Sequence, residues 1–216
     1  MRPVAGLINA AIRYAKAGVF VFPLRVRIVH GRKSVTPISH WDQESTVDRR
    51  TIIGWFNPRC GVWRDGSLGI DCGKSGLVVV DPDGAEGVAS WGAFALQHRI
   101  AATWRCATPG GGQHWYFRAD PATEFGNTAG KIAPHVDTRG RGGFVIAPPS
   151  RDTRGAYRWL EGEPEWQQLP VIPQIVVERA TRRDRPPPVG IAPRANGSVR
   201  RFTHDQAIEF CRPWME

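Results

Sequence analysis

The sequence predicts a mixed α/β fold of the α+β class, in which short strands are joined by single helices. Short apolar or alternating runs bounded by Gly, Pro or Asp recur along the chain and are typical of strands. Stretches in which apolar residues recur every three or four positions, as in a helix, occur singly between these runs. No long internal repeat is present. The chain has 216 residues, 41% of them hydrophobic, so it is long enough to bury a substantial core.

The predicted elements follow in order over the first 180 residues. A helix is expected from Val4 to Ala17, after Pro3 and before Gly18. Two more helices are expected, from Val47 to Phe56 with Thr46 as N-cap and from Glu86 to His98 with Leu96 on its apolar face. Strands are expected at residues 19–24, 68–71, 77–81, 103–107, 113–118, 144–147 and 156–160. Residues 25–45 are expected to be polar and irregular.

The charge is strongly basic and is dominated by arginine. Of the 29 basic residues four are lysines, which leaves 25 arginines, and the net charge is +9. Arginine binds phosphate through two parallel hydrogen bonds and stacks on bases, which favours a polyanionic partner, although coding bias in a GC-rich genome explains the composition equally well. Residues 179–201 carry seven arginines against Asp184, so we expect a basic, Pro-rich linker there and a helical segment at 202–216.

Several classes of protein are disfavoured by the sequence. No apolar run approaches the length of a membrane helix, and the N-terminus lacks the pattern of a secretory signal, so we expect a cytoplasmic protein with no membrane partner. The four cysteines form no CxxC pair, so no structural zinc is expected. They are expected to be buried, reduced thiols: Cys60, Cys72, Cys106 and Cys211.

The sharpest local pattern is an apolar strand that ends in two carboxylates, Asp81 and Asp83. Residues 77–80 are all apolar, which is typical of a strand buried on both faces. Side chains alternate along a strand, so the two carboxylates point the same way and offer hard oxygen ligands for one or two Mg²⁺ or Mn²⁺ ions. Pro82 lacks an N–H, which places the pair at the end or edge of the strand. Asp-Pro-Asp-Gly is also a good turn sequence, so a simple turn stays open as the alternative.

A second pattern is a glycine turn followed by a strand, from Thr108 to Phe117. The N–H groups of Gly111 and Gly112 can approach a ligand closely and bind phosphate oxygens. His114 follows just inside the strand, on the face opposite to Trp115. A single histidine at such a place is compatible with a structural role as well as with a ligand contact.

A third pattern runs from His135 to Ser150 and contains Asp137 and Arg139. Asp137 offers a third carboxylate. Arg139 falls on the same side of an extended segment, where it would neutralise phosphate charge beside a metal. A surface Asp–Arg pair followed by a glycine loop explains this segment equally well when it is taken alone.

Together, the three segments resemble the N-terminal domain of the bifunctional DNA primase/polymerases (Prim-Pol), which belong to the archaeo-eukaryotic primase superfamily. The family pattern is an apolar strand ending in Asp-x-Asp or Asp-x-Glu, then a small-x-His motif, then an apolar residue followed by Asp. Here these motifs read Val80-Asp81-Pro-Asp83, Gly112-Gln-His114 and Val136-Asp137. Supporting resemblance covers most of residues 5–170. Pro82 departs from the pattern, since the family usually has an apolar residue there.

The resemblance implies a primase-like catalytic core in residues 1–178, with an RRM-like sheet and an additional α/β subdomain. It implies that the carboxylates of Asp81, Asp83 and Asp137 bind the catalytic ions, two Mg²⁺ or Mn²⁺ being expected. The resemblance implies that these three aspartates, together with His114, form the catalytic set. It also implies a group of nucleotide contacts, consisting of His114, Arg139, Gly111, Gly112 and Ser75.

The activity implied by the resemblance is that of a template-dependent nucleotidyltransferase. Such an enzyme synthesises or extends primers on single-stranded DNA from NTP or dNTP, by two-metal phosphoryl transfer. The helicase module usual in the family does not follow, so a separate replicative helicase is an expected partner. A phage or plasmid replication gene in a bacterial host is the expected setting.

Two other functions stay open at this stage. A non-catalytic module that binds single-stranded DNA or tethers a replisome would bind template without divalent ions and incorporate no nucleotide. A metal-dependent nuclease also uses paired aspartates and a histidine, and it would cut labelled DNA in Mn²⁺ without nucleotides.

Overall fold

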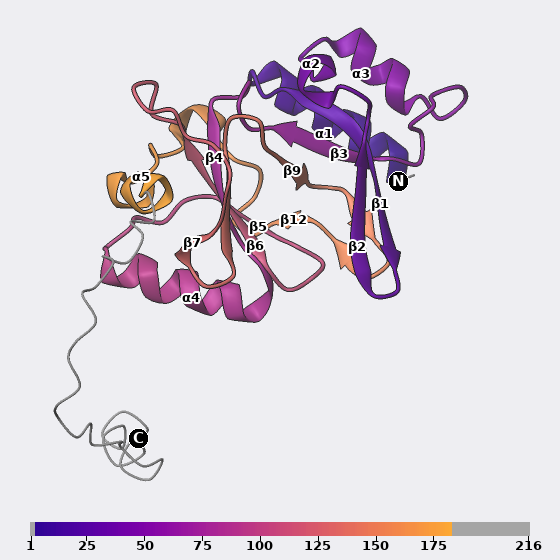
Figure 1. Cartoon of the computed structure of the whole chain (residues 1–216). Coiled ribbons are helices and arrows are strands. Elements are labelled where there is room, and N and C mark those ends of the chain that lie inside the picture. Colours follow the sequence, from indigo (N-terminus) through magenta and orange to yellow (C-terminus); the bar gives the residue numbers. More distant parts are fainter. Residues whose placement is uncertain (1–2, 183–216) are drawn as a thin grey trace, which may run out of the picture. The chain divides into compact units, whose positions relative to one another are not determined.

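The computed structural model describes residues 3–182, and within them strands and helices alternate along the chain (Figure 1). Neighbouring strands within each sheet pair antiparallel. The predicted α+β class is therefore confirmed. The segment predicted at 202–216, most of the linker predicted at 179–201, and Cys211 lie outside the described residues.

The elements have the following bounds. The helices are α1 (Pro3–Lys16), α2 (Trp41–Glu44), α3 (Arg49–Phe56), α4 (Gly84–Gln97) and α5 (Gln174–Thr181), with a 3-10 turn at Trp166–Gln168. The first six strands are β1 (Val21–Val29), β2 (Arg32–Pro37), β3 (Ser67–Asp71), β4 (Leu77–Pro82), β5 (Arg105–Ala107) and β6 (Gln113–Arg118). The others are β7 (Thr128–Ala133), β8 (Val136–Arg139), β9 (Phe144–Ala147), β10 (Arg151–Asp152), β11 (Gly155–Ala156) and β12 (Arg158–Trp159).

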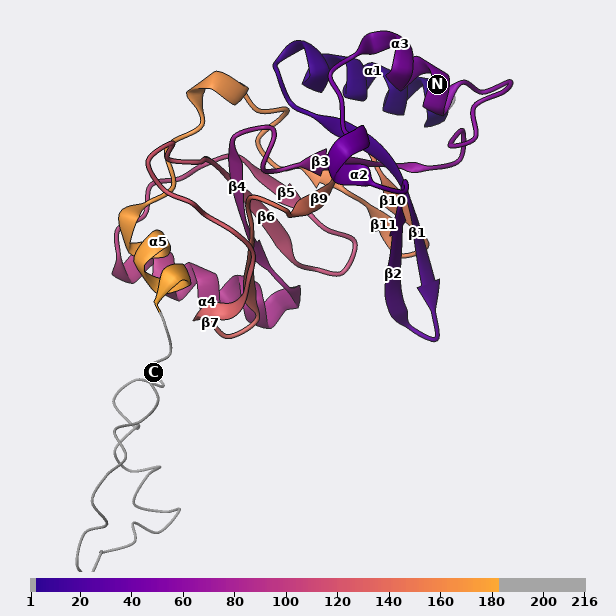
Figure 2. The same cartoon turned by 45° about the horizontal axis from the view of Figure 1, so that its top comes forward.

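Two sheets organise the described residues. The four-stranded sheet has the order β2-β1-β3-β9, and the six-stranded sheet has the order β12-β5-β6-β4-β8-β7. Helices α1 and α3 pack on the first sheet, whereas α4 and α5 pack on the second (Figures 1 and 2). Strand β4 is thus central in its sheet, between β6 and β8. None of the described helices combines the length and the apolar character needed to cross a lipid bilayer.

Strand β4 is buried on both faces, as its apolar run predicts. Val78 and Val80 belong to the core formed with α4 and α5, whereas Leu77 and Val79 belong to the core shared with the four-stranded sheet. Side chains alternate along a strand, so Asp81 continues the face of Val79. The apolar pattern of this strand therefore directs its terminal carboxylate into the space between the two sheets.

The region predicted to be irregular, residues 25–45, contains instead a hairpin and a short helix. Strand β1 continues to Val29, and β2 pairs with it through the turn His30-Gly31. The prediction was wrong because arginines alternate with the apolar residues of β1, and this alternation is itself a strand pattern.

Smaller differences have local causes. The N-cap of α3 is Asp48 rather than Thr46, since the Asp48 carboxylate accepts a hydrogen bond from the N–H of Thr51. Leu96 is 83% exposed rather than on the buried face of α4, and Cys60 is exposed, whereas Cys72 and Cys106 are buried as predicted.

Candidate active site

The strand register brings three of the predicted segments together on one face of the six-stranded sheet. Asp81 of β4 lies directly opposite Asp137 of β8, and Val79 lies opposite Arg139. Directly opposed residues of an antiparallel pair point to the same face. On the other side of β4, Val79 lies opposite Tyr116, so His114, two residues earlier on β6, shares that face too. Residues that are 56 positions apart in the sequence thus meet at one end of the sheet.

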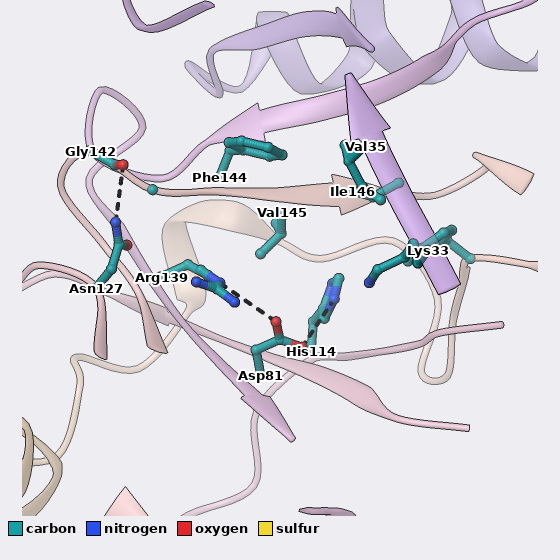
Figure 3. A pocket seen from close by; sticks show the side chains of 12 residues that line it. Lys33, Val35, Asp81, His114, Asn127, Arg139, Gly142, Phe144, Val145 and Ile146 are labelled. Atoms are coloured by element: carbon teal, nitrogen blue, oxygen red, sulfur yellow. Dashed lines mark hydrogen bonds and ion pairs between the residues drawn. The ribbon is translucent and has the colours of Figure 1, made fainter. Parts of the chain in front are cut away.

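The Asp81 carboxylate is buried between a histidine and an arginine. Its Oδ1 lies 3.4 Å from Nε2 of His114, and its Oδ2 lies 3.7 Å from Nε of Arg139 (Figure 3). Both distances are longer than those of strong charge-assisted hydrogen bonds. Only 14% of the Asp81 side chain is exposed, so this carboxylate has given up water without gaining short hydrogen bonds from these two partners.

Burial raises the pKa of Asp81, and the neighbouring Asp137 carboxylate raises it further. Arg139 and Lys33 oppose this by lowering the pKa of the same carboxyl. Asp83 also has a raised pKa, from desolvation first and from the Asp81 carboxylate second. The site therefore holds carboxylates that repel one another and that a cation would stabilise.

His114 is buried in its neutral form. Desolvation first and the positive charge of Lys33 second lower the pKa of His114 to about 3. The imidazole therefore acts as a hydrogen-bonding group and not as a positive charge at neutral pH. Its Nδ1 is buried and has no hydrogen-bond partner among the described residues.

Asp137 is held by two hydrogen bonds from within the chain. Its Oδ1 accepts from the N–H of Gly130 at 3.1 Å, and its Oδ2 accepts from Nη2 of Arg139 at 3.0 Å. Arg139 thus bridges the carboxylates of Asp137 and Asp81. Asp83 follows β4 as the N-cap residue of α4, yet its side chain makes no capping hydrogen bond, which leaves its oxygens available.

The glycine turn packs against the end of β4. A Cβ on Gly112 would lie 2.4 Å from the carbonyl oxygen of Pro82, so only glycine fits this position. The N–H of Gly111 donates to the carbonyl of Thr108, and the N–H of Gly112 donates to its hydroxyl. The predicted phosphate donors are thus used inside the turn and do not line the pocket. The contact instead sets the start of β6, and with it His114, against the end of β4.

Ser75 lies away from the carboxylates. Its hydroxyl accepts a hydrogen bond from the N–H of Phe20, and it lines a different depression, beside Leu77 and Trp166. The neighbouring Lys74 donates from Nζ to the carbonyls of Gln43 and Ser45. The structure does not bring these two residues to the site, and the predicted nucleotide contact of Ser75 stays a prediction.

A pocket of about 320 Å³ opens between the two sheets at this site. Among the predicted residues it is lined by Asp81, His114 and Arg139. The sequence analysis missed further lining residues, which are Lys33, Val35, Asn127, Gly142, Gly143, Phe144, Val145, Ile146 and Tyr157. The alternation along residues 25–29 and the His30-Gly31 turn signal the hairpin that carries Lys33. No local pattern marks Asn127, which reaches the wall by accepting from the N–H of Gly140 and donating to the carbonyl of Gly142.

The carboxylates at this site are of the chemical type that binds divalent cations. Asp81, Asp83 and Asp137 offer the hard oxygen ligands that Mg²⁺ and Mn²⁺ prefer, and the pKa values of the first two are raised by burial first and by neighbouring carboxylates second. In residues 3–182 no three His, Cys, Asp or Glu side chains are arranged to hold an ion together, and Arg139 contacts the carboxylates of both Asp81 and Asp137. The guanidinium thus supplies positive charge to both carboxylates.

Comparison with known families gives one match over most of the chain. The model of the Prim-Pol family, described as bifunctional DNA primase/polymerase, N-terminal, matches residues 11–199. The matched range includes every residue of the site. Comparison with curated proteins found no match.

Proposed function

Since the chain belongs to the bifunctional DNA primase/polymerase family, we propose that it is a template-dependent nucleotidyltransferase that synthesises or extends primers on single-stranded DNA. The observation that supports this most directly is the register of β4 and β8, in which Asp81 lies opposite Asp137. His114 and Arg139 share that face and line one pocket with Asp81. A pocket of about 320 Å³ is at the lower end of the usual size of small-molecule sites.

The chain's own residues position and neutralise charge. Asp81 lies in β4 between Val80 and Pro82, which are both buried, so the position of its carboxylate is restricted. Arg139 reaches both Asp81 and Asp137, and its planar guanidinium is suited to phosphate oxygens once a nucleotide enters. His114 stays neutral and offers an N–H, so its contact with a phosphate oxygen would be a hydrogen bond without charge.

We assign two Mg²⁺ or Mn²⁺ ions to the carboxylates of Asp81, Asp83 and Asp137. The chemistry that such ions supply is stabilisation of the attacking 3′-oxygen and the leaving pyrophosphate oxygen in an in-line displacement at the α-phosphate. We further propose that single-stranded template is held through arginine contacts to its phosphates, with residues 179–201 contributing, and that a separate helicase supplies it. A primase-like catalytic core and a replication setting in phage or plasmid belong to the same proposal.

The test is nucleotide incorporation by the full chain. A single-stranded template, with and without an annealed primer, is incubated with NTP and dNTP mixtures in Mg²⁺ or Mn²⁺, and products are resolved by length. We expect metal-dependent extension by the wild-type chain, and none by Asp81→Ala or Asp137→Ala. Circular dichroism of both variants checks that they fold. Full activity in either variant would contradict the assignment of the carboxylates.

Two further measurements, of template binding and of DNA cleavage, separate the proposed function from its two rivals. Template binding without divalent ions, together with no incorporation under any condition, would identify a binding or tethering module. Cleavage of labelled DNA in Mn²⁺ without nucleotides, lost in Asp81→Ala, would identify a nuclease.

A further inference from the structure

The β1–β2 hairpin carries basic side chains on both faces and contains no acidic residue. Its turn, His30-Gly31, has two residues with positive φ, 49° and 75°, which is the conformation that matches the twist of a two-residue hairpin. This turn fixes the register, in which Ile28 lies opposite Lys33 and Val29 lies opposite Arg32. A slip of one residue would move every side chain of β2 to the other face.

The register sorts two neighbouring cations onto opposite faces of β2. Lys33 shares its face with Val35, and both line the pocket that contains Asp81. Arg32 and Ser34 lie on the other face; Arg32, Lys33 and Ser34 are all exposed, but of the three only Lys33 lines the pocket. The strand therefore presents one of its two positive charges to the mouth of the pocket and the other away from it.

The ammonium group of Lys33 reaches into the pocket toward His114, while Arg139 lies on the other side of Asp81 (Figure 3). The side chain of Lys33 makes no hydrogen bond or ion pair within residues 3–182, although its charge lowers the pKa values of Asp81 and His114. Lys74 differs, because its ammonium group donates to two carbonyl oxygens. An exposed lysine whose ammonium group lies at a pocket wall beside a neutral imidazole is free to contact an anionic ligand.

We propose that Lys33 binds the phosphate groups of the nucleotide in this pocket, facing Arg139, so that one cation from each sheet holds the triphosphate. This inference rests on the proposed function. It assigns recognition of the nucleotide's triphosphate to Lys33. Lysine is a common phosphate ligand because its ammonium group is a compact charge with three rotatable donors. A hairpin is a suitable carrier, since it reaches from the four-stranded sheet to the site on the six-stranded one.

The test compares Lys33→Gln with Arg32→Gln in the full chain. The two variants remove the same charge from neighbouring positions on opposite faces of one strand, so Arg32→Gln is the matched control. In primer extension at saturating template we expect Lys33→Gln to raise the KM for dNTP about tenfold or more, with kcat within about threefold. Arg32→Gln should leave the KM for dNTP within about twofold, and Lys33→Arg should restore part of the affinity.

A second readout isolates the phosphate groups from base and sugar. Inorganic tripolyphosphate should inhibit the wild-type chain competitively with dNTP, and Lys33→Gln should weaken this inhibition by a factor similar to the rise in KM. Unchanged KM and unchanged inhibition in Lys33→Gln would overturn the inference. A fall in kcat alone would also overturn it, since that is the result of a purely structural role.

Equilibrium binding of a fluorescent dNTP keeps the two proposals separate. If the wild-type chain incorporates no nucleotide but binds the dNTP, the proposed function fails, and weaker binding by Lys33→Gln than by Arg32→Gln still supports the phosphate contact. If the wild-type chain neither incorporates nor binds the dNTP, both proposals fail.

Discussion

Two aspartates lie at the ends of two successive strands, β3 and β4, and their environments are opposite. Asp71 ends β3 and is 3% exposed; its Oδ2 accepts from the Ser45 hydroxyl at 2.7 Å, and its Oδ1 accepts from the N–H of Lys74 at 3.1 Å. Asp81 is the last residue but one of β4, and its contacts to His114 and Arg139 are longer, 3.4 and 3.7 Å. A buried carboxylate with complete internal hydrogen bonds stabilises the fold, whereas one with incomplete bonds beside a pocket is available to a ligand.

The largest expected difference is in activity. Asp81→Asn should lower nucleotide incorporation by about 10³-fold or more, because it removes the charge at the centre of the site. Its free energy of unfolding at neutral pH should be unchanged or higher, since burial disfavours the ionised form of Asp81. Primer extension and urea unfolding measure the two effects. A stable Asp81→Asn variant with wild-type activity would remove the distinction between the two aspartates.

The reverse pattern is expected at the end of β3. Asp71→Ala should lower the free energy of unfolding by about 2–4 kcal/mol, because it leaves the buried Ser45 hydroxyl and the Lys74 N–H without their acceptor. Urea unfolding measures this loss. Incorporation per folded molecule should stay within about threefold of wild type at a temperature where the variant is folded. A stable but inactive Asp71→Ala would assign a direct role in the chemistry to this residue as well.

The two strand ends should also differ in their response to pH, because Asp81 contacts a histidine whereas the partners of Asp71 do not titrate. The pKa of His114 in the folded chain is about 3, below its ordinary value of 6.5, so the fold favours the neutral imidazole. This contribution to stability is complete above pH 6.5 and is lost as the pH falls from 6.5 toward 3.

Relative to His114→Gln, wild type should lose up to about 1.4 kcal/mol of unfolding free energy for each pH unit in that window. Urea unfolding of both chains at pH 7.5, 6.5 and 5.5 in chelator measures the difference. Parallel curves for the two proteins would show that His114 takes up a proton as easily in the folded as in the unfolded chain.

The smallest effect concerns one partner of Asp71. Ser45→Ala removes a single buried hydrogen bond and should lower the free energy of unfolding by about 1–2 kcal/mol, less than Asp71→Ala. Thermal and urea unfolding of the two single variants and of the double variant measure the coupling. Additive losses in the double variant would indicate that this hydrogen bond does not stabilise the fold.

The strands that carry the site could be predicted because their patterns are local. The apolar run before Asp81 marks β4, and the alternation around Trp115 and the run before Pro148 mark β6 and β9. The order of the three motifs also allowed the family to be proposed from the sequence, and the family is confirmed. The motifs are brought together by the register of β4 with its two neighbouring strands. This register is a tertiary property, and local sequence patterns do not reveal it.

Other features had no sufficient local signal. Asp71 and Asp81 both follow apolar strands, and their difference arises from Ser45 in one case and from Arg139 in the other, each distant in sequence. Lys33 was missed because the arginines beside it made the hairpin resemble a polar loop. Tyr157 lines the pocket from a segment whose pattern predicts an ordinary strand.

Strand β2 forms one edge of the four-stranded sheet, and Arg32 and Lys33 lie at its start. An unpaired strand edge is a template onto which another chain can add, and basic side chains there make such an addition electrostatically costly. Neutralising both positions would therefore favour self-association of the protein through this edge. These two charges therefore also disfavour the addition of a second copy of the chain at this edge.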